Sequence, residues 1–361
     1  MKNILLIVSA LFLGSVTLTA QRRVLNMPDI PGYVTLKCDF HSHTVFSDGN
    51  VWPTQRVGEA WRDGLDALAI TDHIEYQPHK DFISADNNAA WKIAKTSADD
   101  YNLILVHGAE ITRSMPPGHL NALFIQDADS LDKPDFMKVI EAAVKQGAFI
   151  QYNHPGWTSQ QPDGIPRLYP VHLELIAKGW LNGIEYFNEY ETYRNATVME
   201  MCREHKLAVM GNSDVHGVIS ETYMEPEYTH RPVTLVFAKE RTLESLREAM
   251  FAGRTAVWYG DSLAGFEQFT GALFRAAVKA GVPYKDDGKN IFFDIINNSD
   301  MPMKLTGGPE GAPAELTLPP NMVVRVRADR RYLKQPLTYS VSNIVTGSGT
   351  VLNAEIDVPL K

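Results

Sequence analysis

Short β-type apolar runs alternate with helix-like stretches along the chain up to about residue 260. One such stretch covers residues 135–146, where Phe136, Val139, Ile140 and Ala143 recur at helical spacing. This alternation favours a parallel sheet or barrel, because each helix returns the chain to the start of the next strand. We predict strands at 35–40, 67–71, 103–108, 120–125, 148–152, 183–187 and 208–211, with further candidates at 234–237 and 255–258. Seven or eight strand–helix units fit a TIM-like barrel.

The pattern changes from about residue 265. Phe266, Phe269, Leu273 and Phe274 mark an amphipathic helix. Short strands punctuated by Gly, Pro and Asn are predicted at 290–296, 314–318, 322–326 and 337–341. We therefore expect a barrel over residues 34–260 and a small antiparallel, sandwich-like β domain over 265–361. The second region holds no histidine, so it cannot contribute to a His-based centre; packing, partner binding and glycan contact are its alternative roles.

Length and charge narrow the function classes. A chain of 361 residues exceeds one ordinary domain. Lys and Arg number 34 against 43 Asp and Glu, and the resulting charge of −9 opposes the basic footprint of a nucleic-acid binder. Cys38 and Cys202 are too few for a disulfide framework or a Cys-rich zinc site. Any metal must be held by histidines and carboxylates.

Residues 1–20 have the composition of a secretory signal. Lys2 supplies a short positive region, residues 4–13 are apolar, and small residues lead to Ala20 before the polar Gln21. The apolar run is short for a membrane span, so we expect cleavage, no stable membrane insertion and a periplasmic product. An uncleaved anchor is the alternative.

Histidines and carboxylates gather at the ends of the predicted strands. His41 and His43 follow the first strand, and an i, i+2 pair on an extended chain points to the same side, so both imidazoles can converge on one ion. Asp214 and His216 form a second such pair. The other donors near strand ends are Asp48, His73, Glu110, His119 and His154. A barrel gathers its functional loops at one mouth, so we predict that all nine donors meet there.

Each donor taken alone has a structural interpretation as well. A single His is more often a hydrogen-bonded, partly buried residue, and Asp48-Gly49 alone is an ordinary turn. The joint pattern argues against this interpretation, because it would need nine polar groups placed independently at one mouth, where burial is costly without pairing or coordination.

The motifs also carry a family resemblance. They are Asp39-Phe40-His41-Ser42-His43, Ser47-Asp48-Gly49, Thr71-Asp72-His73, Gly108-Ala109-Glu110, Gly118-His119, Asn153-His154-Pro155 and Ser213-Asp214-Val215-His216. In this order over about residues 34–260, the chain resembles the polymerase and histidinol phosphatase (PHP) family. The whole chain resembles secreted bacterial PHP phosphodiesterases with an appended C-terminal β domain. The resemblance implies a distorted (β/α)7 barrel, a centre of two or three metals and phosphoester hydrolysis.

The resemblance also implies a ligand set. His41, His43, Glu110 and Asp214 would hold a first ion, Glu110, His119 and His154 a second, and Asp48, His73 and His216 a third. Asp48 stands where the most histidine-rich members have His. The third site therefore has a carboxylate oxygen, which is a harder ligand in the acid–base sense, in place of an imidazole nitrogen. Mixed His and carboxylate ligands suit Zn²⁺, Mn²⁺ or Fe²⁺ and do not choose among them.

Two divalent ions lower the pKa of a shared water and make a hydroxide that can attack phosphorus, so no side-chain nucleophile is needed. We predict that Asp72 accepts a hydrogen bond from a ligand imidazole, with capping of the following loop as its alternative role. Arg113 is the predicted phosphate clamp, since guanidinium matches oxyanions; a solvated loop Arg is the alternative. Weaker candidates for substrate contact are Arg167, Arg194, Trp157 and Tyr190.

We therefore expect a metal-dependent phosphoester hydrolase acting on a small molecule. A phosphodiester is favoured because few Arg or Lys flank the ligand motifs, whereas a dianionic monoester needs several cations. The alternatives are a histidinol-phosphatase-like monoesterase and a non-catalytic metal- or ligand-binding module. An amidohydrolase would bring a bridging Lys, where Glu110 stands here. The signal and the acidic charge argue against a polymerase partner, and the sequence does not indicate an oligomeric state.

Overall fold

The computed structural model describes residues 21–188, 196–223, 230–333 and 335–360. Its barrel strands are β1 (Val34–Asp39), β2 (Ala67–Ile70), β3 (Ile104–Ile111), β4 (Leu120–Leu123), β5 (Phe149–Tyr152), β6 (Leu181–Phe187) and β7 (Ala208–Gly211). These strands lie side by side in chain order, while β8 (Val233–Ala238) pairs with β1 and β9 (Thr255–Tyr259) pairs with β8. The predicted distorted, TIM-like barrel is confirmed.

The barrel closes where β7 meets β8 and β9. The backbone N–H of Val209 donates to Thr255 Oγ1 over 3.1 Å, and that of Gly211 donates to Thr234 Oγ1 over 2.9 Å. A Cβ at Gly211 would lie 2.2 Å from Val257 Cγ1, so only glycine allows the strands to approach this closely. Side chains thus replace the backbone ladder at this seam.

The predicted strand–helix alternation is interrupted between β3 and β4. Only residues 112–119 separate these strands, which is too short for the crossover that a parallel neighbour needs. β4 accordingly runs antiparallel to both β3 and β5. This reversal turns the start of β4 toward the rim where β3 and β5 end.

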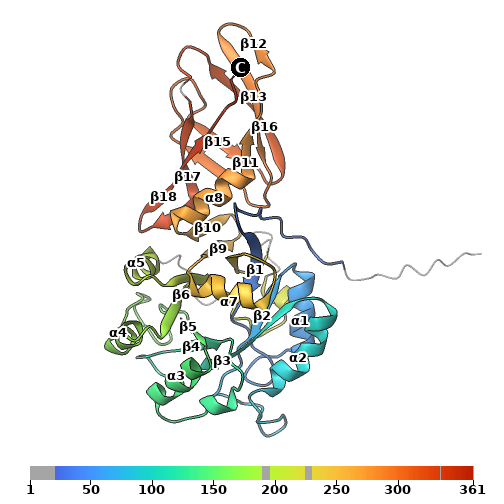
Figure 1. Cartoon of the computed structure of the whole chain (residues 1–361), viewed down its shortest axis with the longest axis vertical. Helices are drawn as coiled ribbons and strands as arrows, with labels where there is room; N and C mark the ends of the chain where they lie inside the picture. Colours follow the sequence, from blue (N-terminus) through green and yellow to red (C-terminus); the bar gives the residue numbers. More distant parts are fainter. Residues whose placement is uncertain (1–20, 189–195, 224–229, 334, 361) are drawn as a thin grey trace, which may run out of the picture.

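The helices of the barrel lie on its outside (Figure 1). They are α1 (Pro53–Arg62), α2 (Ala89–Asp100), α3 (Phe136–Lys145), α4 (Pro170–Ala177), α5 (Ala196–His205), α6 (Ile219–Thr222) and α7 (Leu243–Phe251), with a 3₁₀ turn at Asp129–Leu131. The sequence pattern explains α3: the Asp135 carboxylate accepts from the N–H of Lys138, and the periodic Val139, Ile140 and Ala143 are buried.

The C-terminal region forms two sheets and one helix, α8 (Glu267–Ala277). In one sheet, β11 (Val278–Ala280), β12 (Lys285–Asp286) and β16 (Met322–Asp329) pair antiparallel with β13 (Asn290–Asn297). The other contains β14 (Met303–Thr306), β15 (Glu315–Leu318), β17 (Leu337–Gly347) and β18 (Thr350–Ile356). Residues of both sheets share one apolar cluster, which confirms the sandwich-like arrangement.

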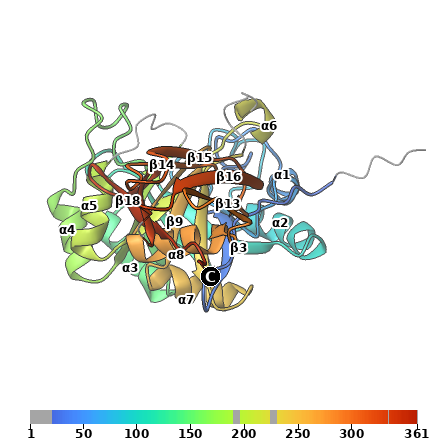
Figure 2. The ribbon, with the colours of Figure 1, turned by 90° about the horizontal axis from the view of Figure 1, so that it is seen from above.

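The two regions are joined by a strand that the sequence pattern did not predict. β10 (Ser262–Gly265) pairs antiparallel with β9 of the barrel and parallel with β17. Hydrogen bonding therefore continues from the barrel into the C-terminal region. Seen from above, the C-terminal strands lie over the middle of the barrel (Figure 2).

Cys38 and Cys202 are free thiols buried in apolar clusters, where each packs as a small hydrophobic residue. In the described part of the chain, the helices all lack the length and apolar character needed to cross a lipid bilayer.

Candidate metal centre

All nine donors predicted from the sequence meet at one rim of the barrel. His41 and His43 follow β1, His73 follows β2, His154 follows β5, and Glu110 lies near the end of β3. The remaining donors are Asp48, His119, Asp214 and His216. His119 precedes its strand, yet it reaches the same rim because β4 runs in the opposite direction.

Glu110 lies at the centre of the cluster. Its carboxylate is buried, with His73 Nδ1 at 2.8 Å and His119 Nδ1 at 3.1 Å. Nε2 atoms of His41, His43 and His154 lie 3.4, 3.4 and 3.5 Å from it. One carboxylate thus lies within 3.5 Å of imidazoles from five separate positions in the sequence, so it would be available to any ion held by these rings.

Two further carboxylates flank Glu110. Asp214 Oδ1 lies 2.9 Å from His43 Nε2 and 3.1 Å from His41 Nε2. Asp48 Oδ1 lies 3.1 Å from His216 Nε2 and 3.5 Å from His73 Nε2. The cluster is therefore a chain of three carboxylates, each surrounded by imidazoles.

Donor atoms within 4.8 Å of one another form four groups in the described residues: His41, His43 and Asp214; His41, Glu110 and His154; His73, Glu110 and His119; and His43, Asp48, His73 and His216. Two of the three implied ligand sets are recognisable in them: His41, His43 and Asp214 of the first set form one group, and Asp48, His73 and His216 of the third set lie in another. The second set is divided, because Glu110 lies in one group with His41 and His154 and in another with His73 and His119. The structure also adds His43 to the group around Asp48.

The chemistry of these atoms fits divalent cations. Five of the facing atoms are buried without a hydrogen-bond partner: His41 Nε2, His43 Nε2, Asp48 Oδ1, Glu110 Oε2 and Asp214 Oδ1. Buried polar atoms without partners are costly, and coordination to a metal would satisfy them together. Nitrogen and carboxylate donors in this mixture suit first-row divalent ions.

The charges of the cluster point the same way. Burial opposes ionisation of Glu110, but the nearby His73 and His41 outweigh it and hold the pKa of Glu110 well below its usual range. Burial also opposes protonation of His73, but Glu110 and Asp48 raise the pKa of His73 to about 10. The carboxylates thus demand positive charge, which divalent ions can supply with release of protons.

Two ligand positions have an unusual backbone. His154 has φ of 27° and Asp214 has φ of 52°, in the left-handed region that non-glycine residues seldom adopt. Such strain persists only when surrounding contacts fix it, and it concentrates at functional sites. The N–H of Asp214 donates to the carbonyl of His41 over 2.8 Å, and that of His154 donates to Glu185 over 2.8 Å.

Glu185 is a functional residue that the sequence reasoning missed. It is fully buried on β6, and its Oε1 lies 2.9 Å from His41 Nδ1. The side-chain amides of Gln151, Asn188 and Asn212 also donate to it. This contact fixes the His41 ring with Nε2 toward the cluster. A single Glu within the otherwise apolar Ile184–Phe187 stretch was the available signal.

Arg56 is a second missed residue. It lies on α1, is completely buried, and donates from Nε and Nη2 to the backbone carbonyl of His43 over 3.1 and 2.9 Å. It also reaches the carbonyls of Val215, His216 and Gly217, and pairs with Glu59 at 2.6 Å. One guanidinium therefore ties the segment after β1 to the segment after β7.

Asp72 bonds to a loop and not, as predicted, directly to the imidazole of a candidate ligand. Its carboxylate accepts from the N–H and hydroxyl of Thr44 and from the Ser47 hydroxyl, each over 2.7 Å. Ser47 Oγ lies 3.3 Å from His43 Nδ1, so Asp72 reaches His43 through one intervening hydroxyl. Asp72 therefore holds the loop after β1, and not the loop that follows Asp72 in the chain, and it has only an indirect link to a candidate ligand.

Arg113, the predicted phosphate clamp, is engaged elsewhere. It pairs with Glu75 and donates to the backbone carbonyls of Thr112 and Lys133. A phosphate contact would require these bonds to break, so the geometry favours a structural role in its loop. Arg167 pairs with Asp163 on the surface. Arg194 and Tyr190 lie outside the described residues.

Beside the cluster lies a cavity of about 350 Å³. Its lining residues are Asp48, His73, Glu110, His119, His154, Trp157, Asp214 and His216. The ring of Trp157 lies 5.2 Å from His154 and 5.7 Å from His119, so this predicted stacking candidate is at the rim. Among the described residues, the lining contains no Lys or Arg, and it contains no Ser or Cys either.

Comparisons with known proteins agree with this geometry. A family model for the PHP domain matches residues 39–230. A crystal structure from Bacteroides vulgatus, described as a two-domain protein containing a predicted PHP-like metal-dependent phosphoesterase, is 37% identical with a TM-score of 0.88, covering 94% of this chain and 99% of that chain. An uncharacterized protein of Methanocaldococcus jannaschii is 37% identical over 193 residues, which are 50% of this chain and 82% of that protein. The chain belongs to the PHP family, as the resemblance implied.

Proposed function

We propose that this protein hydrolyses phosphodiesters of small molecules with two or three divalent metal ions. The observation that carries the proposal is the set of five buried, unpartnered donor atoms of His41, His43, Asp48, Glu110 and Asp214 beside one cavity. Divalent ions bound there supply Lewis acidity toward phosphoryl oxygens and lower the pKa of water. The B. vulgatus relative is described as containing a predicted PHP-like metal-dependent phosphoesterase, and this supports phosphoester hydrolysis as the reaction class.

The proposed ligand roles keep the sets that the family resemblance implies, and the short distances around Glu110 support them. His41, His43, Asp214 and Glu110 bind one ion, Glu110, His119 and His154 a second, and Asp48, His73 and His216 a third. Glu185 keeps the His41 ring oriented, and the Asn153 amide donates to Glu110 Oε1 over 2.9 Å. A water molecule is the proposed nucleophile, because the described lining residues offer no hydroxyl or thiol.

Preference for a diester rests on charge. A phosphomonoester dianion needs cations beyond the metals, and no described lining residue is Lys or Arg. A diester carries one negative charge and a second ester group, for which the apolar face of Trp157 offers a contact surface. Histidinol-phosphatase-like monoester cleavage is the competing outcome.

The test compares two substrates on the same enzyme. Mature protein is stripped with chelator, reloaded separately with Mn²⁺, Zn²⁺ or Fe²⁺, and assayed with bis(p-nitrophenyl) phosphate and p-nitrophenyl phosphate. The diester should give the larger kcat/KM with at least one metal. The reverse order would assign a monoesterase, and no turnover of either ester with any metal would contradict phosphoester hydrolysis.

We also propose periplasmic localisation, on the sequence of residues 1–20 alone. Fractionation of cells expressing the full chain with a C-terminal tag tests it. The proposal predicts recovery in the periplasmic fraction with an N-terminus near residue 21, and recovery of the uncleaved chain in the membrane or cytoplasm would contradict it.

A further inference from the structure

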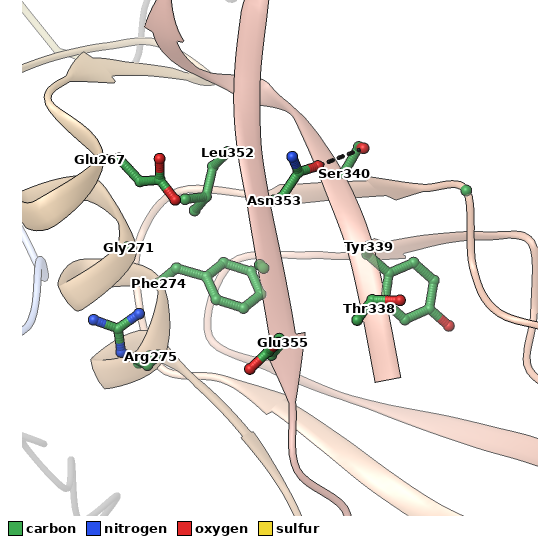
Figure 3. A pocket seen from close by; sticks show the side chains of 12 residues that line it. Glu267, Gly271, Phe274, Arg275, Thr338, Tyr339, Ser340, Leu352, Asn353 and Glu355 are labelled. Carbon is green, nitrogen blue, oxygen red and sulfur yellow. Dashed lines mark hydrogen bonds between the residues drawn. The ribbon is translucent and has the colours of Figure 1, made fainter. Parts of the chain in front are cut away.

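A second cavity, of about 430 Å³, lies in the C-terminal region between α8 and the β17–β18 hairpin (Figure 3). One wall is formed by Glu267, Gly271 and Arg275 of α8. The opposite wall is formed by the polar side chains Thr338, Ser340, Asn353 and Glu355 of β17 and β18. Its volume lies in the range of small-molecule sites. We call it the α8–β18 cavity.

The charged side chains that line this cavity have no partners within the described part of the protein. The side chains of Glu267, Arg275 and Glu355 make no hydrogen bond or ion pair with any residue that the structure describes. Glu267 and Arg275 are eight residues apart on one helix face, or about 12 Å at 1.5 Å per residue, so they are too distant to pair. A carboxylate and a guanidinium therefore flank the cavity without neutralising each other.

Gly271 keeps the space between them open. It lies one turn from both Glu267 and Arg275, in the interior of α8, where glycine costs about 1 kcal/mol relative to alanine. A Cβ there would lie 3.3 Å from Arg275 Nη1 and 3.6 Å from Leu352 Cδ1. A larger side chain would fill the cavity.

The floor of the cavity is apolar. Phe274, Tyr339 and Leu352 close the cavity from below but are almost fully buried, so they expose very little surface to it, and the Tyr339 hydroxyl donates to the carbonyl of Pro313 over 3.1 Å. Above the floor, Ser340 Oγ donates to Asn353 Oδ1 over 3.0 Å, as Figure 3 shows. The surface open to a ligand is therefore mainly that of the walls, which carry hydrogen-bond donors and acceptors on both sides.

These features define the chemistry of a ligand. A simple anion would meet two carboxylates, and a simple cation would meet Arg275. A chain of sugar rings fits better, because its uncharged hydroxyls both donate and accept hydrogen bonds and can bond the carboxylates, the amide and the guanidinium of the two walls. Planar carboxylate, amide and guanidinium groups can each contact two adjacent hydroxyls. We propose that the α8–β18 cavity binds a neutral oligosaccharide, independently of the metal centre.

Isothermal titration calorimetry on the mature protein tests this proposal. The neutral probes are cellotriose, maltotriose, xylotriose and triacetylchitotriose. The charged comparison probes are the anionic trigalacturonate and the cationic trisaccharide of glucosamine. At least one neutral trisaccharide should bind with a millimolar or tighter Kd. Absence of binding by all four at millimolar concentration, or binding of charged probes alone, would overturn the proposal.

Two variants show where a bound sugar sits. Gly271→Leu places a branched side chain in the cavity between Glu267 and Arg275 and improves helix propensity, so the fold should persist while affinity falls roughly tenfold or more. Glu315→Gln removes one exposed carboxylate of the same region outside the cavity, and affinity should stay within about twofold. Unchanged affinity in Gly271→Leu would refute the site. Phosphodiester turnover should be the same in both variants.

Discussion

Arg56 Nη2 donates to the backbone carbonyl of His43 over 2.9 Å, from a side chain that is completely buried. The same guanidinium reaches the carbonyls of Val215 and His216. A residue on the first helix therefore fixes the relative position of two segments that carry candidate ligands.

Removal of this guanidinium should loosen the centre. We expect Arg56→Met to lower the free energy of unfolding by about 3–5 kcal/mol, because Glu59 stays buried without its partner. Urea unfolding checks this value. The double variant Arg56→Met/Glu59→Met should regain part of that stability yet still bind metal more weakly than the parent. Equal metal affinity in the double variant and the parent would show that Arg56 does not position the ligands.

Glu185→Gln tests the orientation of His41. The substitution keeps the shape but removes the negative charge, and it places an NH₂ group among the donors from His154, Asn188 and Asn212. We expect metal affinity to fall about 10- to 100-fold while the fold persists. Competition with a chromogenic chelator measures the affinity, and circular dichroism checks the fold. An unchanged affinity would mean that Glu185 serves packing alone.

The central carboxylate should matter most for turnover. Glu110→Gln removes the charge shared by His73, His119 and three further imidazoles, so we expect kcat to fall at least about a hundredfold with the fold intact. His43→Ala should have a similar effect. His205→Ala, on the outer helix α5, is the control and should retain full activity. Full activity in Glu110→Gln would remove it from the proposed centre.

His230 predicts a pH dependence away from the metal centre. Its Nδ1 bonds the carbonyl of Arg231 at 2.6 Å, its Nε2 is buried without a partner, and burial lowers the pKa of His230 to about 4. An unfolded His titrates near 6.5, so the unfolded chain binds more protons between about pH 4 and 6.5. The stability from neutral His230 is complete above about pH 6.5 and is lost as the pH falls toward 4.

Urea unfolding at pH 7 and pH 5 measures this contribution. The parent should lose about 1–2 kcal/mol more than His230→Phe over this interval, because the variant has no imidazole to protonate. Comparing the two proteins removes the titration that they share at the metal centre. Identical pH slopes would mean that His230 is not kept neutral by the fold.

The sequence was informative where a pattern is local. The i, i+2 pairs at His41/His43 and Asp214/His216 and the periodic apolar face of α3 follow from strand and helix geometry, and the structure brings these donors together. The antiparallel direction of β4 could be predicted only from the length of the preceding loop, since the eight residues between β3 and β4 leave no room for a crossover.

Long-range contacts were not readable in this way. Glu185 and Arg56 look like an ordinary strand Glu and helix Arg, and their roles depend on partners 144 and as many as 161 residues away. Arg113 shows the converse, because a loop Arg near Glu110 resembles a substrate clamp until Glu75 is seen to pair with it. Tertiary packing, rather than local spacing, decides which polar groups face the cavity.

Metal stoichiometry tests the central claim most directly. Mature protein, chelated, reloaded with Mn²⁺ or Zn²⁺ and freed of excess ion, should contain two or three equivalents by elemental analysis. Less than one equivalent after loading with either metal would contradict a centre built from these nine side chains.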